Sequence, residues 1–332
     1  MSAEPPKLKV TIDETDEPDG YSPPQIAAIA QQLIANMEKV ILGKHTQVVL
    51  SVAALLAEGH LLIEDVPGVA KTMLARALAH SAGCTFKRIQ CTPDLRPEDV
   101  IGETRLDPES GKPEFYFGPL FSQFVLVDEI NRANPRTQSA LLEAMGESSV
   151  TVGRVIYYLQ KPFMVIATQN PIEQEGTFAL PEAQKDRFLI QLRLGYPARS
   201  DEEQMLVQFE RRHPIETLLP VTHPEQIILC QEAVRRVQVE RNVRDFILTL
   251  VRTTREYPSL LLGASPRASL GILRLAQAMA AIDGKDSVTI DLVKSLAVPV
   301  LAHRLIVKPD RISRYHNGAE VLREFLEGRK PE

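Results

Sequence analysis

Two segments of this chain carry residue types that can bind and hydrolyse a nucleotide triphosphate. Residues 65–72 resemble a phosphate loop, in which backbone N–H groups and a helix N-terminus hold the β- and γ-phosphates. There, Lys71 would neutralise phosphate charge and the Thr72 hydroxyl would ligate Mg²⁺. Downstream, a fully apolar run ends in Asp128, which can hold Mg²⁺ through its water shell, and Glu129, which can polarise the attacking water. Together the two segments predict a nucleotide triphosphatase.

The phosphate-loop segment departs from the strict pattern at two glycine positions. The first of these is Asp65 and the glycine normally before the lysine is Ala70, which leaves Gly68 as the only glycine. A methyl group at position 70 requires a negative φ, because alanine strongly disfavours the mirror-image backbone. Taken alone, residues 67–72 could form an ordinary strand-to-helix turn, and the two carboxylates could be acids at a helix start. The prediction therefore depends on both segments occurring in one chain.

Three further residues extend the predicted site. Asn170 follows a buried strand and is expected to hold the water or the γ-phosphate, with an Asn-Pro turn as the alternative. Arg187 precedes the next strand and is either a salt-bridged surface arginine or a finger that reaches a neighbouring subunit's γ-phosphate. Arg267 lies in the first turn of a predicted lid helix, where the helix dipole disfavours a cation unless a bound phosphate compensates it.

Alternating strands and helices must bring these residues together. Five β-prone runs and an intervening helix at residues 71–82 predict an α/β fold with a five-stranded parallel sheet covered on both faces. Such sheets bind ligands at the carboxyl ends of their strands. Two β-hairpins, at residues 103–117 and 149–159, interrupt the alternation and should project from the layered core. The predicted strands are residues 60–64, 85–91, 124–129, 162–168 and 189–194.

The chain divides into three predicted parts. Residues 1–24 are rich in proline and acidic residues, cannot bury enough apolar surface to become ordered, and are expected to form a flexible tail. Residues 25–198 are expected to form the α/β nucleotide-binding core. Residues 199–332 should form a lid of helices only, because the β-prone runs end there.

Helix signals define this lid. Residues 222–225 indicate a capping box, and Ser265 followed by proline begins a helix that ends at Gly284. A further helix opens at Thr289 and should end before Pro299, since proline disfavours helical geometry in the residue before it.

Composition narrows the function classes. The net charge is −5 and the charges are of mixed sign, which disfavours a broad nucleic-acid footprint. The three cysteines lack CxxC spacing, so we expect a reducing, cytoplasmic location and neither a disulfide framework nor a zinc site. The seven histidines include no pair three or four residues apart, which disfavours a histidine metal site. The sequence shows no signal pattern and predicts no membrane insertion.

With these motifs in order, the chain resembles a MoxR-type AAA+ ATPase of the helix-2-insert clade, from about Val40 to about Leu305. The hairpin at residues 103–117 is similar to the helix-2 insert of that clade, and the hairpin at 149–159 to its pre-sensor-1 insert. The segments that carry the resemblance are residues 64–72, 92–95, 128–133, 138–145, 167–173, 180–184, 186–188 and 263–267.

The resemblance implies a role for each candidate residue. Lys71 would be the Walker A lysine, Asp128 and Glu129 the Walker B pair, Asn170 sensor 1, Arg187 the arginine finger, and Arg267 sensor 2. It also implies ATP and Mg²⁺ as cofactors, with Thr72 and Asp128 at the metal. The expected nucleotide contacts are Ile41, Val66, Pro67, Gly68, Val69, Ala70, Lys71, Thr72, Met73 and Arg267.

The resemblance further implies a ring, usually a homo-hexamer, with ATP between subunits and a chaperone-like role in maturing or remodelling other proteins. Partners of such ATPases often contain von Willebrand factor A domains. Two alternatives stay open: a nucleotide-gated scaffold that hardly hydrolyses ATP because Ala70 distorts the loop, and an AAA+ nucleic-acid motor. The motor needs basic or aromatic hairpin tips, for which the chain offers only Lys112, Arg154, Tyr157 and Tyr158.

Overall fold

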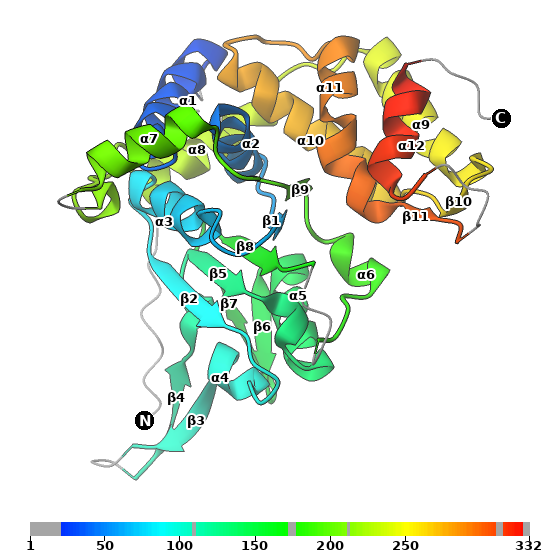
Figure 1. The fold of residues 1–332 in the computed structure, drawn as a ribbon. Helices are drawn as coiled ribbons and strands as arrows, with labels where there is room; N and C mark the ends of the chain where they lie inside the picture. The colour runs from blue at the N-terminus through cyan, green and yellow to red at the C-terminus, as the bar shows by residue number, and fades with distance from the viewer. Residues whose placement is uncertain (1–20, 108–110, 172–176, 211–212, 310–314, 328–332) are drawn as a thin grey trace, which may run out of the picture.

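A five-stranded parallel sheet forms the centre of the computed structural model (Figure 1). The strand order is β2-β5-β8-β1-β9 and every neighbouring pair is parallel, so the five carboxyl ends meet at one edge. This confirms the predicted sheet. The structure describes residues 21–107, 111–171, 177–210, 213–309 and 315–327. The strands are β1 (Leu61–Glu64), β2 (Phe86–Gln90), β5 (Phe124–Asp128), β8 (Met164–Gln169) and β9 (Ile190–Leu192).

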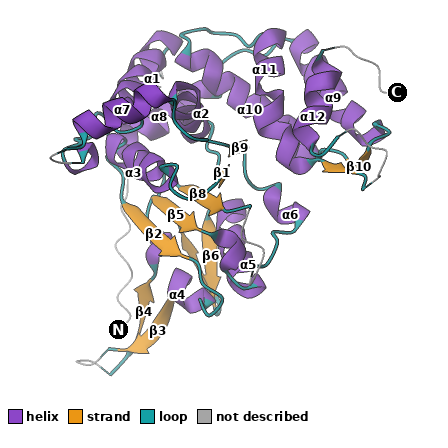
Figure 2. Ribbon diagram, in the orientation of Figure 1, coloured by secondary structure: helices purple, strands orange, loops and turns teal. Residues whose placement is uncertain are grey.

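Helices lie on both faces of the sheet (Figure 2). The side chains of its strands alternate between two apolar clusters, one on each face. Ile63, Leu126 and Ile166 belong to the cluster that contains residues of α1, α2 and α3. The alternating residues Leu62 and Val127 belong to the cluster that contains residues of α5. Burying each such side chain contributes about 1.5–3 kcal/mol. These helices are α1 (Pro23–Glu38), α2 (His45–Leu56), α3 (Lys71–Ser81) and α5 (Pro135–Glu147).

Helix α1 begins slightly earlier than expected. Its cap is Ser22 and its first residues are Pro23 and Pro24, which suits proline because the first helical N–H groups have no partner within the helix. The last residues of the predicted tail therefore belong to the helix. Residues 1–20 of that tail lie outside the described residues.

Two β-hairpins extend from the core, as predicted. They pack against each other, since the rings of Phe115 and Tyr157 stack with 4.8 Å between their centroids. The first hairpin forms the projection at the bottom of Figure 1. The hairpins are β3 (Gly102–Leu106) with β4 (Pro113–Phe117), and β6 (Ser149–Val152) with β7 (Val155–Tyr158). Short helices complete the core: α4 (Pro97–Ile101), η1 (Pro119–Phe121), η2 (Ile130–Arg132) and α6 (Glu182–Lys185).

The C-terminal lid is mainly helical, and its helices α8 and α10 pack on α1 and α2 of the core. It also contains a short antiparallel pair, β10 and β11, so the expectation of helices only was wrong. The segments that follow α9 and η4 lie side by side, and each satisfies backbone groups of the other. The elements after β9 are α7 (Arg199–Gln208), η3 (Pro214–Glu216), α8 (Pro224–Val234), α9 (Arg241–Glu256), β10 (Leu260–Leu262), α10 (Pro266–Ile282), α11 (Ile290–Leu301), η4 (Ala302–Arg304), β11 (Ile306–Val307) and α12 (Gly318–Leu326).

Helix α11 differs from its prediction. It opens after Thr289 as expected, but it continues through Pro299 to Leu301. Proline in a helix interior costs about 3 kcal/mol, yet Val300 and Leu301 are fully buried just beyond it. Packing of that last turn therefore outweighs the local preference. Helix α8 also starts differently, because His223, within the predicted capping box, is the N-cap residue.

None of the helices in the described part of the chain combines the length and the apolar character that a bilayer span requires.

The buried His60 makes the stability of the core depend on pH. Its Nδ1 accepts from the Val165 N–H at 3.0 Å, so Nε2 carries the proton and donates to the Met145 carbonyl at 3.1 Å. Burial lowers the pKa of His60 from 6.5 to about 4. Between these two values the unfolded chain binds a proton that the folded chain excludes, so stability falls as the pH falls.

We expect the free energy of unfolding to drop by about 2 kcal/mol from this residue between about pH 7.5 and about pH 5. Urea unfolding at the two pH values measures the loss. His60→Gln, which keeps a donor and an acceptor, should show a smaller loss. An equal loss in the variant would contradict the assignment to His60.

Candidate active site

The phosphate-loop segment joins β1 to α3 at the carboxyl edge of the sheet. Gly68 has φ +85° and Ala70 has φ +63°, so both lie in the left-handed region. The expectation of a negative φ at Ala70 was wrong. The alanine takes the conformation that a glycine would take, because the chain must reverse there to begin α3 at Lys71. Holding an alanine there costs about 1–2 kcal/mol, which the surrounding structure compensates.

This geometry predicts opposite effects for two matched substitutions. Ala70→Gly relieves the left-handed strain but gives the unfolded chain more freedom, so the stability should stay equal or rise by up to about 1 kcal/mol. Gly68→Ala introduces the same strain where no atom lies within 4 Å of the added methyl, so it should cost about 1 kcal/mol through the backbone alone. Thermal unfolding of both variants measures the pair. A clear loss of stability in Ala70→Gly would show that the methyl makes contacts that outweigh the strain.

Asp65, which occupies the first glycine position of the phosphate-loop pattern, has a structural role of its own. Its Oδ1 accepts from the Val66 N–H at 2.8 Å, and its Oδ2 accepts from the N–H groups of Leu194 and Gly195, both at 2.6 Å. The carboxylate therefore ties the beginning of the phosphate loop to the segment that follows β9. Hydrogen bonds to a charged group contribute about 1.5–3 kcal/mol each, so this side chain holds the loop in place.

Lys71 lies between two strand ends. Its Nζ donates to the Asp65 carbonyl at 2.6 Å and, more weakly, to the Gln169 carbonyl at 3.4 Å. The Asp65 N–H also donates to the Gln169 carbonyl at 3.2 Å. The ammonium group is thus positioned at the loop by the ends of β1 and β8. Asn170, the next residue after β8, is buried beside it.

Asp128 ends β5 and has both carboxylate oxygens engaged. Oδ1 accepts from the Thr168 hydroxyl at 2.6 Å, and Oδ2 accepts from Nε and Nη2 of Arg88 at 3.0 and 2.7 Å. A carboxylate held in this way suits the outer-sphere role predicted for it, in which it binds the water shell of Mg²⁺. Arg88 and Thr72 line the same hollow of about 600 Å³, which places the predicted metal ligand Thr72 on this side of the site.

Glu129 lies directly beyond the strand in a strained conformation. Its φ is +56°, and its N–H donates to the Thr168 hydroxyl at 2.9 Å, which fixes the turn. Its Oε2 accepts from Arg132 at 3.0 Å and from Gln90 at 3.2 Å. Left-handed backbone at a non-glycine residue costs about 1–3 kcal/mol and is concentrated at functional sites. With this backbone conformation, the Glu129 carboxylate lies beside Arg132 and Gln90 at the carboxyl edge of the sheet.

The remaining predicted nucleotide contacts lie close to this edge. Ile41, Val69 and Met73 belong to one apolar cluster, in which Ile41 and Val69 are buried and Met73 is partly exposed. Pro67 and Gly68 are exposed at the tip of the loop.

Arg187 and the start of the helix that carries Arg267 lie near the opposite edge of the sheet from the phosphate loop. Leu189, two residues after Arg187, donates its N–H to the His60 carbonyl at the amino end of β1. This edge is about 13 Å from the phosphate loop, since a strand rises about 3.3 Å per residue. The Arg187 guanidinium donates to the Leu142 carbonyl in α5. Ser265, which caps the helix that carries Arg267, bonds to Asp186 at 2.8 Å.

The structure therefore brings Lys71, Thr72, Asp128, Glu129 and Asn170 together and separates the two arginines from them. For Arg187 this position agrees with a finger that serves a neighbouring subunit. For Arg267 the bond between Ser265 and Asp186 places the start of its helix near the edge of the sheet that holds Arg187, and its expected role at the nucleotide stays a prediction. The Arg267 side chain is exposed there.

Sequence reasoning missed Arg88 and the network around Asp186 and Arg304. Arg88 lies in an edge strand, where an arginine normally faces solvent, and only the register that pairs Gln90 with Asp128 brings it to that carboxylate. Arg304 is 118 positions away from its partner Asp186 and belongs to no motif, so no sequence signal could have identified the pair.

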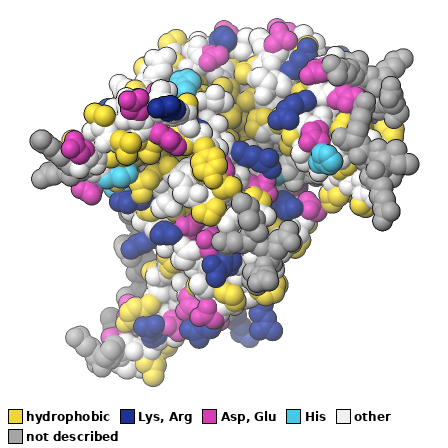
Figure 3. All heavy atoms as spheres, in the orientation of Figure 1, with side chains coloured by type: hydrophobic (Ala, Val, Ile, Leu, Met, Phe, Trp, Pro, Cys, Tyr) yellow, Lys and Arg dark blue, Asp and Glu magenta, His cyan; other side chains and the backbone are white. Residues whose placement is uncertain are grey.

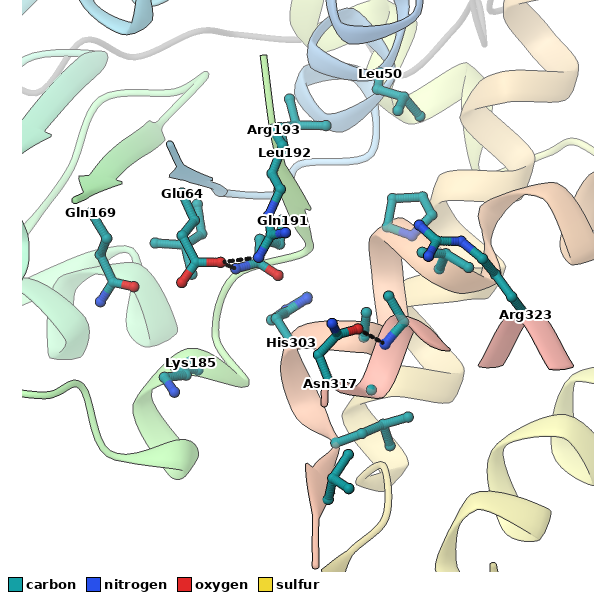
Figure 4. Close-up of a pocket in the computed structure, with 18 of the residues that line it drawn as sticks. Leu50, Glu64, Gln169, Lys185, Gln191, Leu192, Arg193, His303, Asn317 and Arg323 are labelled. Atoms are coloured by element: carbon teal, nitrogen blue, oxygen red, sulfur yellow. Dashed lines mark hydrogen bonds and ion pairs between the residues drawn. The ribbon is translucent and has the colours of Figure 1, made fainter. Parts of the chain in front are cut away.

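A separate cavity of about 810 Å³ lies between the edge of the sheet and the lid (Figure 4). Glu64 at the end of β1 accepts from Gln191 and Arg193, both at 2.8 Å, on one wall. His303, Asn317 and other lid residues form the opposite wall. Lys71 and Asp128 do not line it. The cavity marks the boundary across which core and lid face each other.

Comparisons with known proteins agree with this architecture. The model of the ATPase family associated with various cellular activities (AAA) matches residues 60–190, and that of the AAA lid domain matches residues 252–324. The chain is 46% identical over 293 residues to YeaC, an uncharacterized protein of Bacillus subtilis. The aligned region covers 88% of this chain and 92% of YeaC. It is 39% identical to Chaperone MoxR1 of Mycobacterium tuberculosis, over 85% of this chain and 77% of that protein.

The fold also matches a solved structure. A protein of Cytophaga hutchinsonii, determined by crystallography at 2.00 Å, superposes with a TM-score of 0.85 and 33% sequence identity, over 93% of this chain and 96% of that one. Fold, site and matched models together define an AAA+ ATPase with a C-terminal lid. Within that class, the chain belongs to the MoxR family.

Proposed function

We propose that this protein is an ATP-hydrolysing ring ATPase, with the homo-hexamer as the expected form, that remodels or matures other proteins. The observation that carries the proposal is the division of the site between two edges of the sheet. Lys71, Asp128 and Glu129 lie at one edge, and Arg187 lies at the other. Two such faces can complement each other between different subunits, and a repeated head-to-tail contact gives a ring when its rotation closes.

The residues at the carboxyl edge fit ATP and Mg²⁺. The left-handed Gly68 and Ala70 shape a loop that ends at the N-terminus of α3, where backbone N–H groups are unpaired within the helix. Lys71 supplies a cation at this loop, the Thr72 hydroxyl would ligate Mg²⁺, and Asp128 would hold the water shell of the ion. When bound, Mg²⁺ neutralises phosphate charge in the transition state of hydrolysis. Glu129 orients and deprotonates the attacking water, and Asn170 holds it.

The same geometry favours the enzyme over the nucleotide-gated scaffold. That alternative requires Ala70 to distort the phosphate loop, but Ala70 has φ +63°, the conformation of the glycine that it replaces. With this conformation at Ala70, Lys71 begins α3 and its Nζ contacts the ends of β1 and β8.

A protein client is supported by the hairpins. Together they expose apolar side chains, among them Phe117 at 61% and Tyr158 at 80%. Tyr157 packs against Phe115, so it is not available to stack on a base. Figure 3 shows basic and acidic side chains interspersed over the visible face. These features suit an apolar polypeptide better than a nucleic-acid backbone, and the name of the relative Chaperone MoxR1 agrees with them.

The test measures ATP turnover and the mass of the assembly. The purified full-length protein should hydrolyse ATP in the presence of Mg²⁺, and a non-hydrolysable ATP analogue should shift its mass in light scattering from subunit to ring. A pull-down with a Glu129→Gln ring would then identify the client, with proteins that contain von Willebrand factor A domains as the expected class. Absence of both turnover and assembly would refute the proposal.

A further inference from the structure

We propose that Asp186 and Arg304 form a clamp through which the lid positions Arg187 for the neighbouring subunit's site. The inference rests on the proposed function, since it concerns how the arginine finger is presented. Asp186 directly precedes Arg187 in the core, and Arg304 lies at the end of η4 in the lid. The two residues are positioning residues, because neither touches the site of its own subunit.

The clamp is an ion pair between a buried arginine and a partly buried aspartate. The side chains of Arg304 and Asp186 are 3% and 20% exposed, and Nε of Arg304 lies 2.8 Å from Oδ1 of Asp186. Removing one partner of such a pair leaves an uncompensated charge, which costs about 3–5 kcal/mol. The contact therefore holds whenever lid and core have the arrangement seen here.

Arg304 also holds the backbone that follows the finger. It donates to the Phe188 carbonyl at 2.6 Å through Nη2 and to the Leu189 carbonyl at 3.2 Å through Nη1. The neighbouring His303 lies 3.2 Å from the same Phe188 carbonyl. Residues on both sides of Arg187 are thus fixed by one guanidinium. A planar fork with five donors can do this, whereas an ammonium group cannot.

A second lid helix joins the same carboxylate. The hydroxyl of Ser265 donates to Oδ2 of Asp186 at 2.8 Å and also accepts from the Arg267 N–H at 3.1 Å. Asp186 therefore connects the finger segment to both η4 and the start of α10. Any rotation of the lid must move Asp186 or break these bonds, so the position of the lid is transmitted directly to Arg187.

In this structure Arg187 is held against its own subunit, so the clamp can affect whether it reaches a neighbouring one. Its guanidinium bonds to the Leu142 carbonyl of its own subunit, so it must leave α5 to reach another subunit. A buried ion pair is weak evidence for a role in stability, because apolar residues of similar size stabilise a protein as well or better. What the pair provides here is a fixed geometry next to Arg187.

The variant Arg304→Met tests the proposal. We expect turnover to fall about 10- to 100-fold, with little change in the ATP concentration for half-maximal rate, because misplacing a catalytic group by about 1 Å has such effects. Arg304→Lys should resemble Met, since charge alone does not restore the fork. The double variant Asp186→Asn with Arg304→Met leaves no buried charge and should show the same loss. Fluorescent ATP binding and thermal unfolding verify that each variant is folded.

Rings assembled from two different variants distinguish a positioning role of Arg304 from a general loss of structure. Arg304→Met subunits keep an intact nucleotide site, and Glu129→Gln subunits keep an intact finger. Each should turn over at about a tenth of the wild-type rate or less alone, but a one-to-one mixture should reach about a quarter of that rate, since one interface in four combines the two intact halves. A mixture of Arg304→Met with Arg187→Ala should recover nothing.

Two results would overturn the inference. The first is normal turnover in the folded Arg304→Met protein. The second concerns the mixtures with Glu129→Gln. If ATP turnover recovers in the mixture with Arg187→Ala but not in the mixture with Arg304→Met, then Arg304 only stabilises the fold. If the Arg187→Ala mixture also stays inactive although wild-type protein turns over, the shared site of the proposed function fails, and the clamp fails with it.

Discussion

Glu129→Gln is expected to lower ATP turnover about 10³-fold while ATP binding stays within a few fold of wild type. The carboxylate acts on the water, and a positioned general base contributes about 10²- to 10⁴-fold. Glutamine has the same shape and can still accept from Arg132 and Gln90, so the turn at the end of β5 is retained. Lys71 and the loop that binds the phosphates are unchanged.

The measurement is steady-state hydrolysis together with equilibrium binding of a fluorescent ATP analogue. Glu143→Gln is the matched control, because it makes the same chemical change on an exposed position of α5 and should leave both quantities unaltered. Turnover at the wild-type rate in Glu129→Gln would remove this residue from the mechanism. Loss of binding along with turnover would show instead that it shapes the loop.

Arg187→Ala is expected to reduce turnover about 10³-fold, because an arginine supplied by a neighbouring subunit stabilises charge on the transferred phosphoryl group by this order. Binding of ATP to isolated subunits should not change, since Arg187 lies at the opposite edge of the sheet from Lys71. Arg187→Lys should rescue little, because lysine cannot reproduce the planar, bidentate contact.

Single-variant rates cannot distinguish this role from loss of the Leu142 contact, but mixed rings can. Arg187→Ala mixed with Glu129→Gln should regain activity that neither has alone, whereas a structural defect stays with its own subunit. Arg244→Ala, an exposed arginine of α9, serves as the control and should behave as wild type. A mixture with no recovery, from rings of normal mass, would exclude a finger that acts between subunits.

The sequence alone determined the parts of this protein that depend on local chemistry. Continuous apolar runs such as the one before Asp128 favour buried parallel strands, and turn residues near Gly111 and Gly153 favour hairpins, so the sheet and both inserts were predictable. The order of strands and helices then placed Lys71, Asp128 and Asn170 at one edge without any knowledge of distances.

Where local preference and packing disagree, the sequence prediction failed. A left-handed alanine at position 70 and a proline inside α11 are both unfavourable by themselves. Each is held by many surrounding contacts that no short segment encodes. The same applies to β10 and β11, whose pairing joins residues more than forty positions apart.

The position of the lid was decided by tertiary structure alone. Arg267 carries a strong local signal, yet which phosphate it can reach depends on how α10 docks against the core, and Asp186 and Arg304 fix that docking across 118 positions. Motifs report which groups a chain possesses, because chemistry needs particular side chains at particular spacings. They do not report which edge of the sheet a distant helix covers, since that follows from contacts between residues far apart in the sequence, both apolar packing and polar bonds such as those of Asp186.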